Sequence, residues 1–195
     1  MTVTNVLICG VGGQGAVLAS ELLALVAVAA GHDAKQGEFH GVAQRGGAVF
    51  SHVRFGERVY SPTAQCGEVD YLVALEKLEA LRYAHFVKPG GTIIVNDHKI
   101  EPIRSGDDRP YPEDAIDFLR AKGFDVIALP ATAQALELGN HRAANVVLLG
   151  ALARLLDIPD EVWQRTLQER IPAKHLELNL EAFAVGGAQA GEPVL

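Results

Sequence analysis

The stretch Val6-Leu-Ile-Cys-Gly10-Val-Gly-Gly-Gln-Gly15 decides the fold of this 195-residue chain. Its apolar residues predict a buried strand, and the G-x-G-x-x-G spacing predicts a tight turn into the apolar run that extends to Ala30. The first glycine permits the turn, the second lets a ligand or backbone come close, and the third packs helix on sheet. The candidate cofactor-binding residues are therefore Gly10, Gly12, Gly13, Gln14 and Gly15.

The rest of the chain alternates strand and helix patterns. Strands are expected at Asn5–Cys9, Val49–Phe55, Tyr71–Leu75, Thr92–Asn96 and Val126–Leu129. Helices are expected at Gln14–Ala30, Lys77–Phe86 and Glu113–Lys122, and, after Pro130, at Ala131–Leu138, Ala143–Leu156, Asp160–Glu169 and Leu176–Phe183. This order predicts a Rossmann-like α/β fold with a mostly parallel sheet and a C-terminal helical layer. We expect one domain over residues 1–184 and a flexible, glycine-containing tail over 185–195.

One segment departs from simple alternation. Val49–Phe55 alternates with a period of two, Gly56-Glu57 supplies a turn, and Arg58-Val-Tyr60 resumes an extended pattern, which predicts an inserted β-hairpin. A nicotinamide-binding domain would instead continue through a helix to its third parallel strand. The hairpin therefore counts against a plain dehydrogenase domain.

A second glycine-rich motif, Gly37-Glu-Phe-His-Gly-Val-Ala-Gln-Arg-Gly-Gly47, follows. It is too rich in glycine for a helix and too polar for a core strand, so it predicts a shaped loop. Small residues there would let another chain or a cofactor approach, whereas the alternative is a solvated loop in which Arg45 pairs with an acid of its own chain. The candidate interface or ligand residues are Glu38, His40, Gln44, Arg45, Gly46 and Gly47.

Composition excludes several classes of function. A net charge of −7 without basic clusters argues against binding nucleic acid. The start of the chain carries no export signal and the longest apolar stretch, Ala16 to Ala30, is too short to cross a bilayer, so we expect a cytoplasmic protein with no membrane contact. The 2 cysteines, Cys9 and Cys66, cannot ligate an iron–sulfur cluster alone, and the 7 histidines lack metal-ligand spacing. We assign no catalytic residue and no metal ligand.

The first glycine motif leaves a nucleotide site open. A dinucleotide site needs an acid at the end of the second strand, roughly 20 residues after the glycines. Asp33 precedes a polar stretch and Glu38 is late, so neither is well placed. Two alternatives nevertheless remain at this stage: a stand-alone NAD(P)-dependent oxidoreductase and a nucleotide-binding regulatory module.

Several motifs in order resemble the gamma-type domain of the 2-oxoacid:ferredoxin oxidoreductases, and especially the beta subunit of its indolepyruvate branch. Besides the two glycine motifs, these are Ser51-His-Val-Arg-Phe-Gly, Tyr60-Ser-Pro, Ala74-Leu-Glu-Lys-Leu-Glu-Ala-Leu-Arg-Tyr, Lys88-Pro-Gly-Gly-Thr, Arg142-Ala-Ala-Asn-Val-Val-Leu-Leu-Gly, Lys174 and Asn179. The likeness covers nearly the whole chain and adds Asn145 to the candidate interface residues. The segment Gly41-Val-Ala-Gln differs from many relatives, which bears on the substrate branch.

The resemblance implies an accessory subunit of a complex that oxidatively decarboxylates a 2-oxoacid to an acyl-CoA and reduces ferredoxin. It implies that thiamine diphosphate, Mg²⁺ and 4Fe-4S clusters belong to a large catalytic partner subunit, while this chain binds none alone. In agreement, Gly106-Asp107-Asp108 is only a partial echo of the G-D-G segment of a thiamine diphosphate site. The expected role is structural and allosteric, through glycine loops packed on the partner.

Overall fold

The core of the molecule is a mixed β-sheet of six strands in the order β2-β3-β1-β4-β5-β6. The computed structural model describes residues 3–40, 46–101 and 110–190. Strands β1, β4, β5 and β6 are mutually parallel, and β3 runs antiparallel to both β1 and β2. The strands are β1 (Val3–Val11), β2 (Asp33–His40), β3 (Ala48–Gly56), β4 (Val69–Ala74), β5 (Val87–Asn96) and β6 (Asp125–Leu129).

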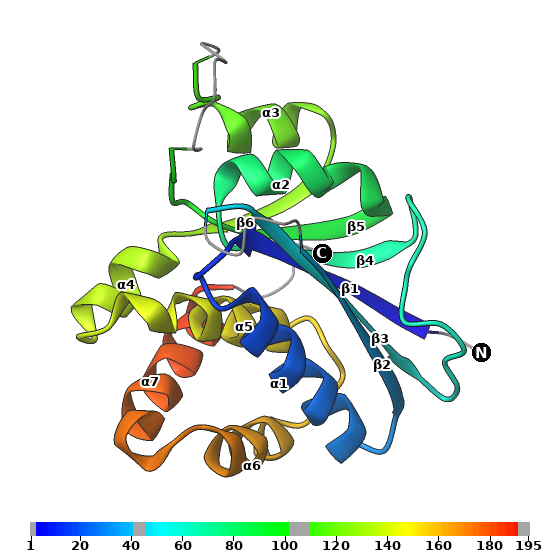
Figure 1. Ribbon diagram of the computed structural model, residues 1–195, viewed down its shortest axis with the longest axis vertical. Helices are drawn as coiled ribbons and strands as arrows, with labels where there is room; N and C mark the ends of the chain where they lie inside the picture. Colours follow the sequence, from blue (N-terminus) through cyan, green and yellow to red (C-terminus); the bar gives the residue numbers. More distant parts are fainter. Residues whose placement is uncertain (1–2, 41–45, 102–109, 191–195) are drawn as a thin grey trace.

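Helices cover both faces of this sheet (Figure 1). The α-helices are α1 (Ala16–Ala29), α2 (Lys77–Tyr83), α3 (Ala115–Ala121), α4 (Ala131–Glu137), α5 (Ala144–Ala153), α6 (Asp160–Arg170) and α7 (Ala173–Gln189), with 3-10 turns at Ala84–Phe86 and His141–Ala143. One buried apolar cluster joins the sheet to α1 and α4–α7, and a second joins it to α2 and α3. The predicted α/β class with a C-terminal helical layer is confirmed.

The C-terminal layer is held by a close crossing of α5 and α7. Every residue of α5 is buried. An added Cβ at Gly150 would lie 2.0 Å from the carbonyl oxygen of Phe183, and one at Gly186 would lie 1.8 Å from that of Val147. Only glycine permits this approach of two backbones. The predicted start of the flexible tail at residue 185 is therefore wrong, since α7 continues to Gln189; residues 191–195 lie outside the described part.

The inserted hairpin exists, but it uses a different pair of strands from the predicted one. Strand β2 pairs with β3 without interruption, from Asp33 opposite Gly56 to His40 opposite Val49. The expected second arm, Arg58–Tyr60, is not a strand; the Val59 amide instead donates to Asp33 Oδ2 at 2.8 Å. Polar residues are tolerated in β2 because it is an edge strand. Residues 37–40, predicted as loop, therefore belong to β2.

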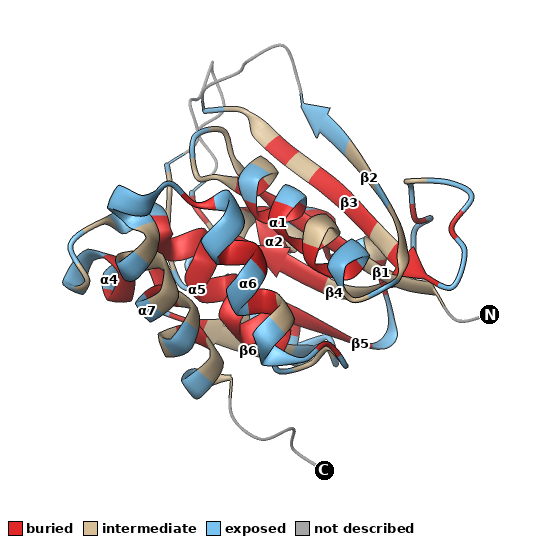
Figure 2. Cartoon of the chain, turned by 90° about the horizontal axis from the view of Figure 1, so that it is seen from below, coloured by how far each residue is buried: buried red, intermediate tan, exposed pale blue. Residues whose placement is uncertain are grey.

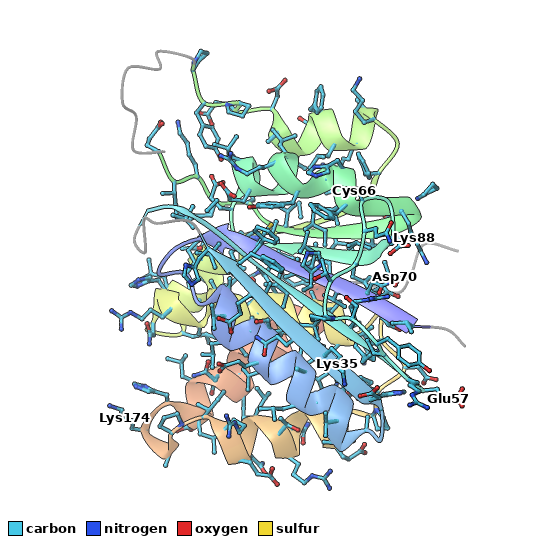
Figure 3. The ribbon with its side chains drawn as sticks, turned by 45° about the vertical axis from the view of Figure 1, so that its right-hand side comes forward. Lys35, Glu57, Cys66, Asp70, Lys88 and Lys174 are labelled. Atoms are coloured by element: carbon cyan, nitrogen blue, oxygen red, sulfur yellow. The ribbon has the colours of Figure 1, made fainter. Side chains whose placement is uncertain are left out.

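The amino ends of the strands are joined by Asp70, the second residue of β4. Its Oδ2 accepts the Asn5 amide of β1 at 2.7 Å, and its Oδ1 contacts Lys88 Nζ of β5 (Figure 3). Arg54 Nε of β3 donates to Asn5 Oδ1 at 2.7 Å. This polar group fixes one end of the sheet and leaves the carboxyl ends of the parallel strands as the place for a site.

An aromatic cluster supports the hairpin on the α2 side. The rings of Phe39 and Phe50 stack with centroids 5.0 Å apart, and those of His52 and Phe86 meet edge to face at 5.6 Å. His52 is 1% exposed, and its Nδ1 accepts the Ala64 amide at 3.4 Å. Burial, with a smaller repulsion from Arg54, lowers the pKa of His52 to about 4. The imidazole is therefore neutral at physiological pH.

This pKa predicts a loss of stability in acid. The unfolded chain binds the His52 proton below about pH 6.5 and the folded chain only near pH 4, so the contribution is complete above pH 6.5 and lost between the two values. We expect the loss to reach ~3 kcal/mol of unfolding free energy. His52→Asn keeps an acceptor for the Ala64 amide and should lack this part of the pH dependence. Urea unfolding of both proteins at pH 7 and pH 4 measures it; identical losses would contradict the assignment.

Candidate functional site

The candidate site is the glycine loop that leads from β1 into α1, at the carboxyl end of the sheet. Gly13 and Gly15 have φ values of 104° and 84°, which only glycine adopts without strain. Asn145 of α5 is buried, and its Nδ2 donates to the Gly15 carbonyl at 3.1 Å. A Cβ on Gly15 would lie 2.5 Å from that nitrogen. The loop is thus held against the helical layer, which brings Asn145 and the first glycine motif together.

Gln14 ties the same loop to the neighbouring strands. Its Oε1 accepts the Val11 amide at 2.8 Å, and its Nε2 donates to the Leu75 carbonyl at 2.8 Å. Asn96, at the end of β5, donates its Nδ2 to the same carbonyl at 3.1 Å. The carboxyl ends of β1, β4 and β5 are therefore joined through one backbone oxygen. Neither Leu75 nor Asn96 was among the residues that the sequence singled out.

Space for a ligand over these strand ends is reduced by the same contacts. Gly10 lies under the Gln14 side chain, and a Cβ on it would lie 2.9 Å from both Gln14 Oε1 and Leu75 Cβ. Gln14 was a candidate cofactor ligand, but both ends of its amide are engaged within the chain. The side chain therefore holds the glycine loop against the neighbouring strands.

The arrangement does not fit a dinucleotide. In nucleotide-binding domains the second strand lies beside the first and ends in the acid that binds the ribose. Here the antiparallel strand β3 occupies that position. Asp33 pairs with Gly56, which pairs in turn with Val3, at the end of β1 farthest from the glycine loop. Glu38 accepts Gln36 Nε2 at 3.2 Å.

The two glycine motifs meet beside the start of α1. The Gly12 amide donates to the Gly47 carbonyl at 2.9 Å, and Gly46 has a φ of 76°. A hollow of about 380 Å³ lies next to this contact, lined by Val11, Gly12, Gly13, Gly15, Ala16, Val17, His40 and Val49. Of the predicted interface residues, His40 thus reaches the hollow and Gly47 adjoins it, whereas Glu38 is not among the lining residues. Gln44 and Arg45 lie outside the described residues.

The chemistry of this lining favours packing over catalysis. Among the described residues that line it, His40 is the only titratable side chain, and the others are glycine, alanine and valine. General acid–base catalysis uses a side chain positioned at the reacting proton, and nucleophilic catalysis usually adds a neighbouring group that activates the nucleophile. Small apolar side chains instead leave room for a segment of another chain.

A second hollow, of about 620 Å³, lies between α5, α6 and α7. It is a weaker candidate for the functional site than the glycine loop. Its lining is mainly apolar, with Leu180 and Phe183 among the contributing residues. The charged residues Arg154 and Asp160 pair at 3.9 Å and are largely exposed. Among the described residues, neither glycine motif contributes to this lining, so we place the candidate site at the glycine loop.

The two cysteines are separated in the fold. Cys9 is buried in β1, and its Sγ contacts the Glu79 carbonyl at 3.7 Å, while Cys66 is exposed. Burial, followed by repulsion from Glu79 and Glu76, raises the pKa of the Cys9 thiol well above its usual range. A protonated, enclosed thiol is a weak nucleophile and a poor metal ligand.

Replacing Gln14 should destabilise the chain. Gln14→Ala leaves the Val11 amide unpaired and removes one donor from the Leu75 carbonyl, which should cost about 1–3 kcal/mol of unfolding free energy. Gln14→Glu keeps an acceptor for Val11 but sets a carboxylate against the carbonyl, so it should not restore stability. Gln168→Ala, an exposed substitution in α6, is the control. Urea unfolding measures the unfolding free energy of all three variants. Wild-type stability of Gln14→Ala would contradict the role of this side chain in holding the loop.

Comparison of this sequence with known proteins identifies a family. The family model described as pyruvate ferredoxin/flavodoxin oxidoreductase matches residues 5–189. Indolepyruvate oxidoreductase subunit IorB of Thermococcus kodakarensis is 37% identical, with 96% of each chain covered. The subunit of the same name from Archaeoglobus fulgidus is 38% identical over 95% of this chain and 94% of its own.

A solved structure agrees with these sequence matches. The gamma subunit of a keto/oxoacid ferredoxin oxidoreductase from Geobacter sulfurreducens superimposes with a TM-score of 0.74 at 26% identity, covering 96% of this chain and 98% of its own. In the described part of this chain, no helix is long and apolar enough to span a membrane. With a family match over residues 5–189 and full-length relatives above 30% identity, the chain belongs to the pyruvate ferredoxin/flavodoxin oxidoreductase family.

Proposed function

We propose that this chain is the accessory subunit of a 2-oxoacid:ferredoxin oxidoreductase that converts indolepyruvate or another arylpyruvate to an acyl-CoA, and that it is inactive alone. The observation that carries this proposal is the full-length match to subunits named for indolepyruvate oxidoreductases. The matches to a pyruvate/ketoisovalerate oxidoreductase gamma subunit and to a 2-oxoglutarate synthase subunit are weaker, at 29% and 31% identity. They support the broader 2-oxoacid class.

The donor groups of the chain support a division of labour between subunits. Thiamine diphosphate, Mg²⁺ and 4Fe-4S clusters supply the decarboxylation and electron transfer, and we assign them to the large catalytic subunit. A 4Fe-4S cluster needs four cysteine thiolates. This chain has 2 cysteines, of which Cys9 is enclosed in the core. In the described part of the chain, no cluster of three or more His, Cys, Asp or Glu side chains could hold a metal ion.

The glycine loop is the surface that we assign to the large subunit. The hollow beside Gly12, Gly13 and His40 offers small side chains and exposed backbone. Backbone accessible in this way suits close packing of another chain. The remaining candidate residues, including Gln44 and Arg45, stay predictions for the same interface, and the cytoplasmic location also stays a prediction.

Nucleotide-binding alternatives lack support. Strand β3 separates β1 from β2, so no acid from the second strand reaches the glycine loop, and the Gln14 side chain is engaged with Val11 and Leu75. Neither the relatives nor the geometry favours a stand-alone NAD(P)-dependent enzyme or a nucleotide-binding regulatory module.

Reconstitution tests the proposal. The chain co-expressed with its large subunit should co-purify and reduce ferredoxin when indolepyruvate and coenzyme A are present, and the chain alone should give no turnover. Ferredoxin reduction followed by its visible absorbance measures both, with pyruvate and 2-oxoglutarate as competing substrates. Turnover of indolepyruvate by the isolated chain would contradict the accessory role, and exclusive use of 2-oxoglutarate would contradict the substrate class.

A further inference from the structure

Strand β2 has an open outer edge. It is the terminal strand of the sheet, and within the described residues no other strand adjoins its outer side (Figure 2). Its pairing with β3 is regular over the whole of Asp33–His40, without a bulge, and it contains no proline. Bulges, prolines and charged side chains are the usual means of protecting an edge against pairing with another strand. Of these, β2 has only charges, and they are engaged within the strand: Asp33 pairs with Lys35, and Glu38 accepts Gln36 Nε2. An edge of this length with no bulge or proline can accept a strand whose side chains are compatible with those charges.

The helix above this edge has a small, apolar flank on the same side. At about 100° per residue, Val17, Glu21, Ala24 and Val28 lie within about 60° of one another on α1. This flank is next to Ser20, whose Oγ accepts Gln36 Nε2 of β2 at 2.7 Å, and Val17 shares the hollow with His40. Val28 is 56% exposed. Glu21 is the only charged residue in α1, and it is exposed.

The edge of β2 and the flank of α1 form one surface, and their spacing suits an added strand with a helix packed on it. Helix α1 packs on both β2 and β3. Strands in a sheet are about 4.8 Å apart, so a helix that packed in the same way on the added strand and the strand beyond it would lie two spacings, about 10 Å, from α1. Packed helices lie about 8–10 Å apart. An added strand would therefore bring its covering helix into contact with the flank of α1.

A second copy of this chain is a poor occupant. Antiparallel pairing of two β2 strands along their length is centred near Gln36 and Gly37, the middle of the strand. Ser20 bonds Gln36, so the two-fold axis would pass beside the adjacent Glu21. The two Glu21 carboxylates would then face each other in an apolar contact, which like charges disfavour.

We propose that an edge strand of the large subunit extends this sheet by pairing with β2, and that a helix beside that strand packs on the flank of α1 with a lysine or arginine facing Glu21. The proposal rests on the proposed function, because it takes the large subunit as the partner. It is continuous with the surface assigned there, since Val17 and His40 line the hollow at the glycine loop. It specifies backbone pairing and one charge pair as the recognition chemistry.

Two measurements on the co-purified complex test it. Hydrogen exchange followed by mass spectrometry should show slower exchange of the outward amides of β2 in the complex than in the isolated chain. Glu21→Lys should weaken binding of the large subunit by roughly tenfold or more, because it sets two cations together in a desolvated contact. Glu181→Lys, the same reversal at an exposed position in the middle of α7, should bind as the wild type does. Circular dichroism and thermal unfolding check that both variants fold.

The outcomes separate the two proposals. No complex with the wild-type chain would refute the proposed function, and this inference with it. A complex in which β2 exchanges as fast as in the isolated chain, or in which Glu21→Lys binds normally, would overturn this inference alone. An isolated chain that forms dimers with protected β2 amides would also overturn it, in favour of a second copy as occupant.

Discussion

The geometry of the glycine loop and of the neighbouring strand ends depends on the carbonyl oxygen of Leu75. It accepts hydrogen bonds from Gln14 Nε2 and Asn96 Nδ2, at 2.8 and 3.1 Å. The Leu75 amide in turn donates to the Cys9 carbonyl at 2.8 Å, so the ends of β1, β4 and β5 are joined around one residue. Buried polar groups that are fully paired fix a single geometry. In this fold they do so at the carboxyl ends of the parallel strands, where open α/β sheets that bind a ligand keep a crevice.

The inserted hairpin also distinguishes this site from a nucleotide site. Strand β3 lies between β1 and β2, so β2 does not place an acid beside the glycine loop. The end of β2 places His40 there, and the Gly12–Gly47 hydrogen bond joins the loop to the start of β3. The result is a continuous surface of backbone and small side chains. Such a surface suits contact with another protein chain, in keeping with relatives that are themselves subunits of oxidoreductases.

Local patterns in the sequence predicted much of the fold. The helices and the four parallel strands follow from apolar periodicity and from glycine and proline positions. The pairing of β2 with β3 did not, because β2 reads Asp33-Ala-Lys-Gln-Gly-Glu-Phe-His, a polar stretch that becomes a strand only as the edge of a sheet. At the candidate site, the glycine spacing predicted the turn into α1, and the family resemblance singled out Asn145, whose Nδ2 bonds the Gly15 carbonyl. The sequence could not identify Leu75 or Asn96, since Gln14 and Leu75 are 61 positions apart and a backbone carbonyl leaves no sequence signal.

The central claim is that Gln14, Leu75 and Asn96 close the strand ends, so that the glycine loop serves protein packing and not nucleotide binding. Calorimetric titration of the folded, isolated chain with NADH and NADPH, up to millimolar concentration, tests this most directly. The account predicts no saturable heat with either nucleotide. Stoichiometric binding at micromolar affinity would contradict it.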